Sequence, residues 1–385
     1  LIAEWIELPL VKQLQLASIS ICNDCRTSTS FHVRVVSRTP RRLWMGATSL
    51  TSRRRGGKDM ATSRVSPLHT SRLTFGQFYN RPVENVVWPA QLHQVTFGKL
   101  FNQSISCVNW PSNLVDVRFG CKFDMPITRV TWPAGLKKIR FGCGFDQDLE
   151  GVSWPRGLQE IKLGGRFDKP ICGVVWPRDL KVLDLGWAFN QPVENVVFPE
   201  GLREMFFSDL FDQPVEAAVF PQSLERLCFG VTFNQEVRRI NWPVNLKHLT
   251  FGCLFSKSLE HIDFPGGMEE MELGCSWNHP LEQVAWPKGL ATLVLGYDFD
   301  HSLGNVVWPD GLRNLYLGDS FSHSLVGVKW PSGMKHITIG DFFDRPLHGV
   351  VWPAGLEELS FGASFCQRLE GVVWPAKVKS VTFGQ

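Results

Sequence analysis

The sequence predicts a mainly β fold, namely a right-handed parallel β-solenoid of 22-residue coils that carries two narrow parallel sheets. A Trp-Pro or Phe-Pro pair recurs every 22 residues from Trp88 to Trp374, without insertion or deletion. Each coil also holds two short segments whose apolar residues alternate, as in strands with one buried face. Gly and Pro interrupt every half-coil, which disfavours helices.

Residues 136–158 illustrate one coil: LKKIRF at 136–141 is the first predicted strand and LEGVSW at 149–154 is the second. Equivalent segments lie one coil apart and every coil runs the same way round. Neighbouring strands must therefore pair in parallel, one sheet for each half-coil. About 14 coils at the ~4.8 Å strand spacing make a rod of roughly 65 Å.

The Trp-Pro pair is predicted to be a structural corner. A residue before proline is held in the extended region, so Trp becomes the last residue of its strand. Proline has no N–H donor, which ends the strand and begins the turn. We expect the indoles to point inward and to stack from coil to coil.

Two regions differ in composition and charge. Residues 1–66 show no copy of the repeat and carry eleven Lys and Arg against four acids, a net charge of +7, which leaves −4 for residues 67–385. We interpret 1–66 as a basic segment that is a transit peptide, a disordered tail or, for 1–59, a gene-model extension ahead of Met60. The array at 67–385 lacks the concentrated positive charge of a nucleic-acid-binding surface, so no nucleic-acid partner is expected.

Ten cysteines are too few for a disulfide-built scaffold of 385 residues, which favours an intracellular, cytoplasmic protein. Cys121 is in register with Cys143, and Cys253 with Cys275, on adjacent coils. Stacked parallel strands hold Cβ atoms ~4.8 Å apart, longer than the ~3.8 Å of a disulfide, so free thiols are predicted. No stretch reaches the ~20 apolar residues of a membrane span.

Several coils resemble a known family. The string Phe189-Asn190-Gln191-Pro192, with FDMPI at 123–127 and FDKPI at 167–171, resembles the FNIP repeat, a leucine-rich-repeat-like unit named for its Phe-Asn-Ile-Pro tetrad. The likeness extends through the WPxGL corner and the LxxLxFG strand, from about 71 to 385. Trp replaces the Leu that many members have before the corner proline, which should change only packing. The resemblance implies a leucine-rich-repeat-like solenoid that binds other proteins and has no catalytic residues.

One column holds Asn or Asp directly after a phenylalanine. Such a side chain can accept hydrogen bonds from the backbone N–H groups of a bend, as in an Asx-turn. A carboxylate column also resembles metal ligands or catalytic acids, but repetition in nearly every coil favours a structural role. Its members are Asn102, Asp124, Asp146, Asp168, Asn190, Asp212, Asn234, Asn278, Asp300 and Asp344.

The candidate partner-binding residues lie between the inward residues of the first strand. Three stacked cations, Arg118, Arg140 and Lys162, give way to a varied stretch that includes Phe206 and Tyr316. A varied, exposed sheet face is what repeat proteins use for recognition. The alternative is a solvated face whose residues drift without function.

The matching column of the second strand is rich in valine. It either reflects β propensity or forms a contact surface for a partner or for another copy of the chain. The valines are Val87, Val175, Val197, Val219, Val307, Val351 and Val373.

The histidines His279, His301 and His323 lie 22 residues apart and are followed by Arg345. Three stacked imidazoles are a speculative zinc site. The alternative is that His replaces the Gln that fills this column in most other coils. The latter interpretation is preferred, so neither a metal nor a cofactor is expected.

Two functions remain in view. The first is a non-enzymatic scaffold that binds a protein partner through the varied strand face. The second is a carbohydrate-active or metal-dependent solenoid enzyme, which would need paired carboxylates about 5–10 Å apart in a groove. Glu269, Glu270 and Glu272 are the nearest acidic cluster, but the ungapped spacing leaves no inserted loop to build a pocket. The scaffold is preferred.

Overall fold

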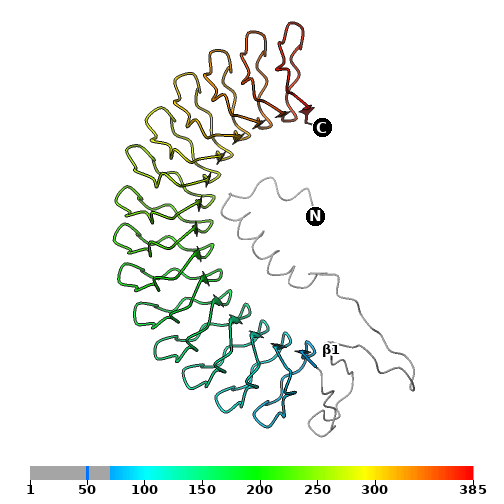
Figure 1. Ribbon diagram of the computed structural model, residues 1–385, viewed down its shortest axis with the longest axis vertical. Helices are drawn as coiled ribbons and strands as arrows, with labels where there is room; N and C mark the ends of the chain where they lie inside the picture. Colours follow the sequence, from blue (N-terminus) through cyan, green and yellow to red (C-terminus); the bar gives the residue numbers. More distant parts are fainter. Residues whose placement is uncertain (1–48, 52–69, 385) are drawn as a thin grey trace, which may run out of the picture. The chain divides into compact units, whose positions relative to one another are not determined.

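The computed structural model describes residues 49–51 and 70–384. Every regular element among them is a short β-strand, one for each coil (Figure 1). The strands are β1 Ser49–Thr51, β2 Arg72–Thr74, β3 Gln94–Thr96, β4 Asp116–Arg118, β5 Lys138–Arg140, β6 Glu160–Lys162, β7 Val182–Asp184, β8 Glu204–Phe206, β9 Arg226–Cys228, β10 His248–Thr250, β11 Glu270–Glu272, β12 Thr292–Val294, β13 Asn314–Tyr316, β14 His336–Thr338, β15 Glu358–Phe361 and β16 Ser380–Phe383.

The strands form one parallel sheet in sequence order, which confirms the predicted parallel solenoid. From β2 onward the register is one coil, so that Leu249 pairs with Met271 and Leu315 with Ile337. β1 pairs with β2 through Ser49 and Arg72, and therefore adds a strand before the predicted boundary at residue 67. The other residues of 1–66 lie outside the described part of the chain, so the division at 67 stays a prediction.

The prediction of a second sheet is wrong for residues 70–384, where the second half-coil is extended but forms no strand. The cause is curvature, because the strands line the inner side of an arc and the other half-coil lies farther out (Figure 1). Ring centroids show the divergence within one pair of coils: 5.4 Å for Phe207–Phe229 beside the sheet, and 6.0 Å for Phe211–Phe233 beyond it. The outer segments are too far apart for the ~4.8 Å spacing of a ladder.

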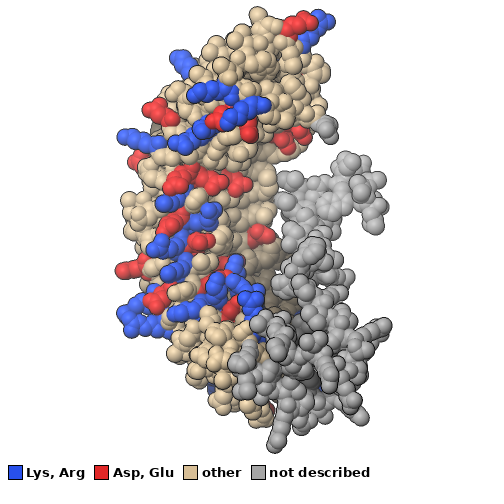
Figure 2. Space-filling model, turned by 45° about the vertical axis from the view of Figure 1, so that its right-hand side comes forward, with Lys and Arg blue, Asp and Glu red and all other residues tan. Residues whose placement is uncertain are grey.

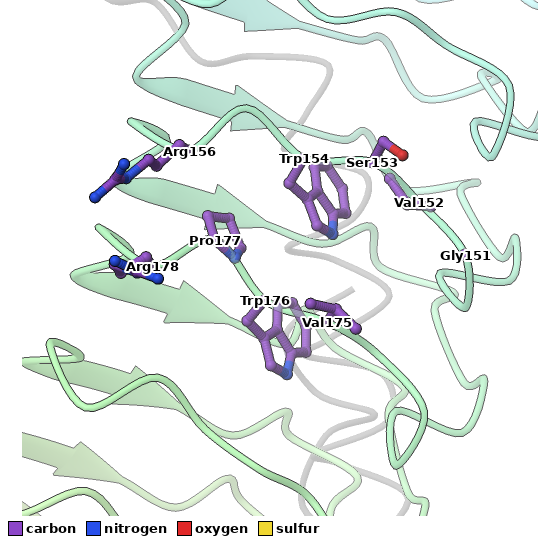
Figure 3. A pocket seen from close by; sticks show the side chains of 9 residues that line it. All are labelled: Gly151, Val152, Ser153, Trp154, Arg156, Val175, Trp176, Pro177 and Arg178. Atoms are coloured by element: carbon purple, nitrogen blue, oxygen red, sulfur yellow. The ribbon is translucent and has the colours of Figure 1, made fainter.

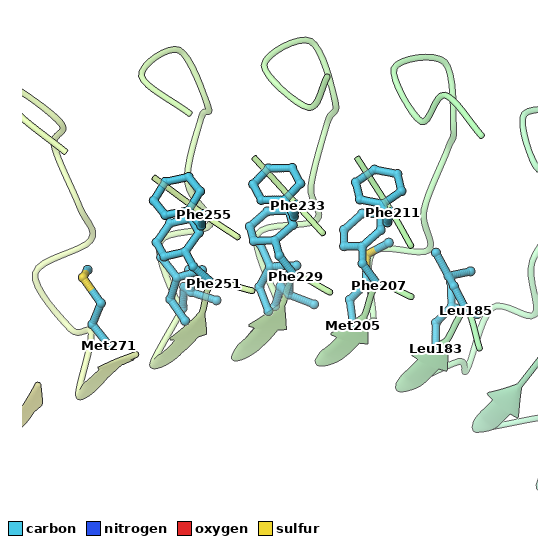
Figure 4. Packing of buried hydrophobic residues seen from close by; sticks show 14 of the residues in the cluster. Leu183, Leu185, Met205, Phe207, Phe211, Phe229, Phe233, Phe251, Phe255 and Met271 are labelled. Atoms are coloured by element: carbon cyan, nitrogen blue, oxygen red, sulfur yellow. The ribbon is translucent and has the colours of Figure 1, made fainter. Parts of the chain in front are cut away.

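Aromatic and aliphatic columns fill the interior, as predicted. The middle residue of each strand points inward, and two stacked phenylalanine columns follow it (Figure 4). The corner tryptophans are buried or pack against the core, and Trp88 stacks on Trp110 with ring centroids 5.6 Å apart. Each coil covers the open face of the next, so stability comes from stacking.

The Asn and Asp column is structural, but its hydrogen bonds run between coils. Asp212 Oδ1 accepts from the backbone N–H of Asn234 at 2.8 Å, one coil ahead, and Asn234 Oδ1 accepts from that of Ser256 at 3.0 Å. Gln235 Nε2 also donates to Asp212 Oδ1 at 2.9 Å. The predicted Asx-turn is therefore wrong: the column ties successive coils together at their outer side, where no strand ladder forms.

The prediction of free thiols is wrong for one of the two cysteine pairs. Cys253 and Cys275 form a disulfide with a Cα–Cα distance of 4.4 Å. The turn after the strand brings the two residues closer than the ~4.8 Å of the sheet itself, within the range that a disulfide spans. Cys121 Sγ lies 3.1 Å from Cys143 Sγ at the equivalent place six coils earlier.

Within residues 49–51 and 70–384 there is no helix long and apolar enough to cross a membrane.

Candidate functional site

Each strand has three positions, of which the middle one points into the core. The first and third residues point to the outer face of the sheet, on the concave side of the arc (Figure 1). The middle position is aliphatic in every strand from β2 to β16. The third position changes from coil to coil: Arg118, Arg140, Lys162, Asp184, Phe206, Cys228, Thr250, Glu272, Val294, Tyr316 and Thr338.

The three predicted cations lie side by side, and acidic neighbours bind each of them. Arg118 contacts Asp116 at 2.7 Å. Arg140 Nε donates to Glu160 Oε1 at 2.9 Å, and its Nη1 lies 3.8 Å from Asp116. The structure thus brings Arg118 and Arg140 together in a continuous ion-pair network that sequence reasoning missed. The signal was present, because Asp116 and Glu160 occupy the first position of the same or the next strand.

The electrostatics of this network centre on Glu160. Burial opposes the charged carboxylate, but hydrogen bonds from Arg140 and Lys138 outweigh it and hold the pKa of Glu160 below its usual range. Burial likewise opposes the charge of Arg140, while Glu160 and Asp116 raise the pKa of its guanidinium. Both groups therefore stay ionised and fixed in position.

Lys162 links this charged zone to the aromatic part of the column. Its Nζ lies 3.3 Å from Asp184 on the next strand and 6.0 Å from the ring centroid of Phe206, one coil farther on. That distance is at the outer limit of a cation–π contact. Tyr316 lies five coils beyond Phe206 and is exposed, so the structure does not bring these two rings together.

The strand-start edge comprises the residue before each strand and the first residue of the strand. Its cations and acids pair between adjacent coils, so blue and red side chains are interleaved along the stack (Figure 2). Hydrogen bonds from Lys379 and Lys335 lower the pKa of Glu357 to about 2. The pairs are Arg203–Glu225 at 2.5 Å, Lys247–Glu269 at 3.4 Å, His248–Glu270 at 2.9 Å, Lys335–Glu357 at 3.1 Å and His336–Glu358 at 3.1 Å.

The histidine column does not form a metal site. His279 Nε2 lies 2.7 Å from the carbonyl oxygen of Ser256, His301 Nε2 lies 3.3 Å from that of Asn278, and His323 Nε2 lies 3.0 Å from that of Asp300. Each ring is thus directed at the backbone of the preceding coil. Across residues 70–384 no group of His, Cys, Asp and Glu side chains is placed to hold a metal ion.

The valine column is exposed, as predicted, and it borders shallow grooves between the corner residues of adjacent coils. One groove, with a volume of about 610 Å³, is lined by Trp154 and Trp176 of adjacent coils together with Val175 and Arg178 (Figure 3). The indole nitrogens of both tryptophans are buried without a hydrogen-bond partner. The valines of this column are each more than 70 % exposed: Val87, Val175, Val197, Val219, Val307, Val351 and Val373.

The acidic cluster considered for catalysis is divided between ion pairs. Glu269 binds Lys247 and Glu270 binds His248, both on the strand-start edge. Glu272 is exposed at the third position of β11 and lies 3.5 Å from the hydroxyl of Thr250. The three carboxylates therefore do not converge on one groove.

Two family models match parts of the array. The FNIP repeat model matches residues 211–254 and 277–320, and the model of the BspA-type leucine-rich repeat region matches residues 72–166. No curated protein matches the chain.

Two solved structures are similar to this chain. CroV588, described as a novel circular LRR protein structure, has a TM-score of 0.69 and 30 % identity, with 85 % of this chain and 55 % of that chain covered. The second is an internalin (inlF) from Listeria monocytogenes str. 4b F2365, with a TM-score of 0.49, 12 % identity, and coverage of 81 % of this chain and 86 % of that one. This chain thus spans about half the length of CroV588. Its repeats are similar to the FNIP repeat and to leucine-rich repeats in the matched segments.

Proposed function

We propose that this chain is a non-enzymatic scaffold that binds a protein partner on the concave face of its sheet. The observation that carries the proposal is the third strand position. It is the last residue of a three-residue strand in coil after coil, yet its side chains include cations, acids, a thiol, hydroxyls and aromatic rings. The fold does not require that variety, whereas recognition of an irregular protein surface does.

The exposed members of this column supply the contacts. Arg118 and Lys162 keep 41 % and 40 % of their side chains exposed, against 26 % for Arg140. Arg140 therefore positions the ion-pair network, while Arg118 and Lys162 contact the partner. Phe206 and Tyr316 provide apolar area of the kind that contributes most to binding energy.

A carbohydrate-active or metal-dependent enzyme is the weaker alternative. Neither family match belongs to a catalytic family, and Glu269 and Glu270 are held in ion pairs outside any groove. A cytoplasmic location stays a prediction, and the disulfide between Cys253 and Cys275 is more typical of an oxidising compartment.

The test is site-specific photocrosslinking with the full chain as bait. A photoreactive residue at Thr250 places the probe at the third strand position, and the matched control at Val197 places it on the outer valine column. We expect a defined partner to crosslink from Thr250 and not from Val197. Equal crosslinking from both positions, or from Val197 alone, would overturn the proposal.

Substitutions then identify the contacts. Arg118→Glu with Lys162→Glu should reverse the local charge, and Phe206→Ala with Tyr316→Ala should remove the half-buried ring of Phe206 and the exposed ring of Tyr316. Each pair is expected to reduce crosslinking from Thr250 at least about tenfold, because truncation of one hot-spot residue costs about 2 kcal/mol or more. If both double variants crosslink the same partner with the yield of the wild type, this column is not the interface.

A further inference from the structure

The strand-end edge comprises the two residues that follow the glycine after each strand, or that follow Ser208 in the coil of β8. Its charges are sorted by sign along the array, unlike those of the strand-start edge. In the coils of β3 to β6 every charged residue of this edge is a cation, and in the coils of β7 to β14 every one is an acid. The cations are Lys99, Lys122 and Arg166, and the acids are Asp209, Asp298, Asp319 and Asp341.

These charges form no ion pairs within the described part of the chain. Among residues 70–384, no ion pair is formed by the side chains of Lys99, Lys122 and Arg166, nor by those of Asp298, Asp319 and Asp341. Five of the six residues are exposed and Asp319 is half-buried. The adjoining third strand position has the same signs, with Arg118, Arg140 and Lys162 on the basic half and Glu272 on the acidic half.

The middle of the edge is apolar. The coils of β7 to β10 place Trp187, Leu210, Val231 and Leu254 there, all half-buried. Asp209 is the one acid of this stretch, and burial together with Asp184 raises its pKa above the usual range of an aspartate. The charged halves also expose Leu100, Tyr297 and Phe342. Apolar and aromatic area beside charged groups is common in protein–protein interfaces.

The strand-end edge is also rigid. In most coils the backbone N–H of the second edge residue donates to the carbonyl oxygen of the first edge residue one coil before it, as in Leu210 to Trp187 at 3.1 Å and Leu254 to Val231 at 2.9 Å. The disulfide Cys253–Cys275 joins two further coils at the same edge. A surface already fixed before association loses little conformational entropy when a partner binds.

We propose that the strand-end edge is a homodimer interface, in which two copies of the chain stack edge to edge with their coils in opposite order. A two-fold axis through the middle of the arc, between β8 and β9, places β3 of one copy against β14 of the other and β4 against β13. Lys99 then faces Asp341 and Lys122 faces Asp319, while Arg166 lies one coil from Asp298. The apolar middle of each copy meets itself.

A second copy of the chain can pair with the charges of both halves of the edge at once, because it carries a basic and an acidic half itself. A basic partner would leave the basic half unpaired, and an acidic partner would leave the acidic half unpaired. The edge spans the coils of β3 to β14 with two residues each, enough for the ~20–30 residues that each partner contributes to a stable interface. This surface is separate from the exposed valine column and from the residues tested under the proposed function.

Charge reversal tests the proposal directly on the full chain. One variant, Lys99→Glu/Lys122→Glu/Arg166→Glu, has two acidic halves, and the other, Asp298→Lys/Asp319→Lys/Asp341→Lys, has two basic halves. We expect wild type at ~50 μM to sediment as a dimer in 50 mM NaCl and its Kd to rise at least about tenfold in 500 mM NaCl. Each variant alone should be monomeric, and an equimolar mixture should form a heterodimer.

The controls make each outcome decisive. A Val175→Ser/Val197→Ser/Val219→Ser variant should remain dimeric, because the valine column lies outside the interface. Far-UV circular dichroism melts check that every variant is folded. A monomeric wild type, a mixture that stays monomeric, or a dimer lost only in the valine variant would each overturn the proposal. Crosslinking from Thr250 to a partner is an independent readout, since none of these variants changes the concave column.

Discussion

At the strand-start edge Lys and Arg of one coil contact Glu of the next, whereas at the strand-end edge cations and acids occupy separate halves of the array. Both edges belong to the same sheet, repeat with the same period and are open to solvent. Stacking alone therefore does not decide how charge is arranged. Pairing within the chain neutralises the first edge, whereas the charges of the second edge form no ion pairs among residues 70–384.

The two edges also differ in how closely the coils approach each other. A Cβ added to Gly230, beyond the end of β9, would lie 1.5 Å from the carbonyl oxygen of Ser208. A Cβ added to Gly201, just before β8, would lie 3.6 Å from the nearest atom, the carbonyl oxygen of Arg178. The strand-end turn at Gly230 is thus tightly packed against the neighbouring coil, while the strand-start turn at Gly201 leaves room for a side chain.

The largest expected effect is a loss of stability, and it tests the difference in packing between Gly230 and Gly201. Gly230→Ala should destabilise the chain by at least about 3 kcal/mol, because the backbone of the neighbouring coil must shift. Gly201→Ala should change stability by less than about 1 kcal/mol. Urea unfolding of the full chain, followed by far-UV circular dichroism, measures both. Equal effects at the two glycines would show that the edges are packed alike.

The next effect concerns the ladder that joins coils on the outer side. Asp212→Ala leaves the backbone N–H of Asn234 and the side-chain amide of Gln235 without their acceptor, which should destabilise the chain by about 1–3 kcal/mol. Asp212→Asn keeps the Oδ1 acceptor and should stay within about 0.5 kcal/mol of wild type. If the asparagine variant lost as much stability as the alanine variant, charge rather than the shared acceptor would hold the ladder.

Acid should weaken the strand-start edge. The folded-state pKa of Glu357 is about 2 and that of Glu160 lies below its usual range, so their stabilisation is complete above the unfolded pKa near 4.5. It is lost as the pH falls through the folded values, that is, from about 4.5 towards 2. Melting temperatures at pH 7 and pH 3 should differ less for Glu160→Gln than for wild type, by the equivalent of about 1 kcal/mol. An identical pH dependence would show that the ion pairs of Glu160 do not stabilise the fold.

The repeat period and the identity of the inward residues could be predicted because one rule applies in every coil. Trp before Pro must be extended and must lie where the next indole can cover it, so stacking of Trp88 on Trp110 follows from the sequence. The curvature does not follow from the period. It appears in the wider spacing away from the sheet, 6.0 Å between the rings of Phe211 and Phe233 against 5.4 Å for Phe207 and Phe229, and the period does not encode that difference.

The sequence predicts which residues of the candidate site stack on one another, but it does not predict the ion pairs that these residues form. Register placed Arg118 beside Arg140, and the structure confirms their adjacency. The contacts of Arg140 with Glu160 and Asp116 depend on side-chain rotamers, which the spacing does not fix. The disulfide Cys253–Cys275 was missed for a similar reason, since its 4.4 Å Cα–Cα distance is set by the turn rather than by the strand spacing.

The smallest expected effect separates the roles of the two edges. Glu225→Ala removes the partner of Arg203 and should lower stability by about 0.5 kcal/mol, as exposed ion pairs typically do. Asp319→Ala removes a carboxylate that has no ion pair among residues 70–384, so in dilute solution it should leave the melting temperature unchanged. At high concentration the order should reverse, with Asp319→Ala weakening the dimer and Glu225→Ala leaving it intact. Sedimentation velocity beside thermal melts measures both, and a stability loss for Asp319→Ala in the dilute sample would mean that the acids of the strand-end edge serve the fold rather than association.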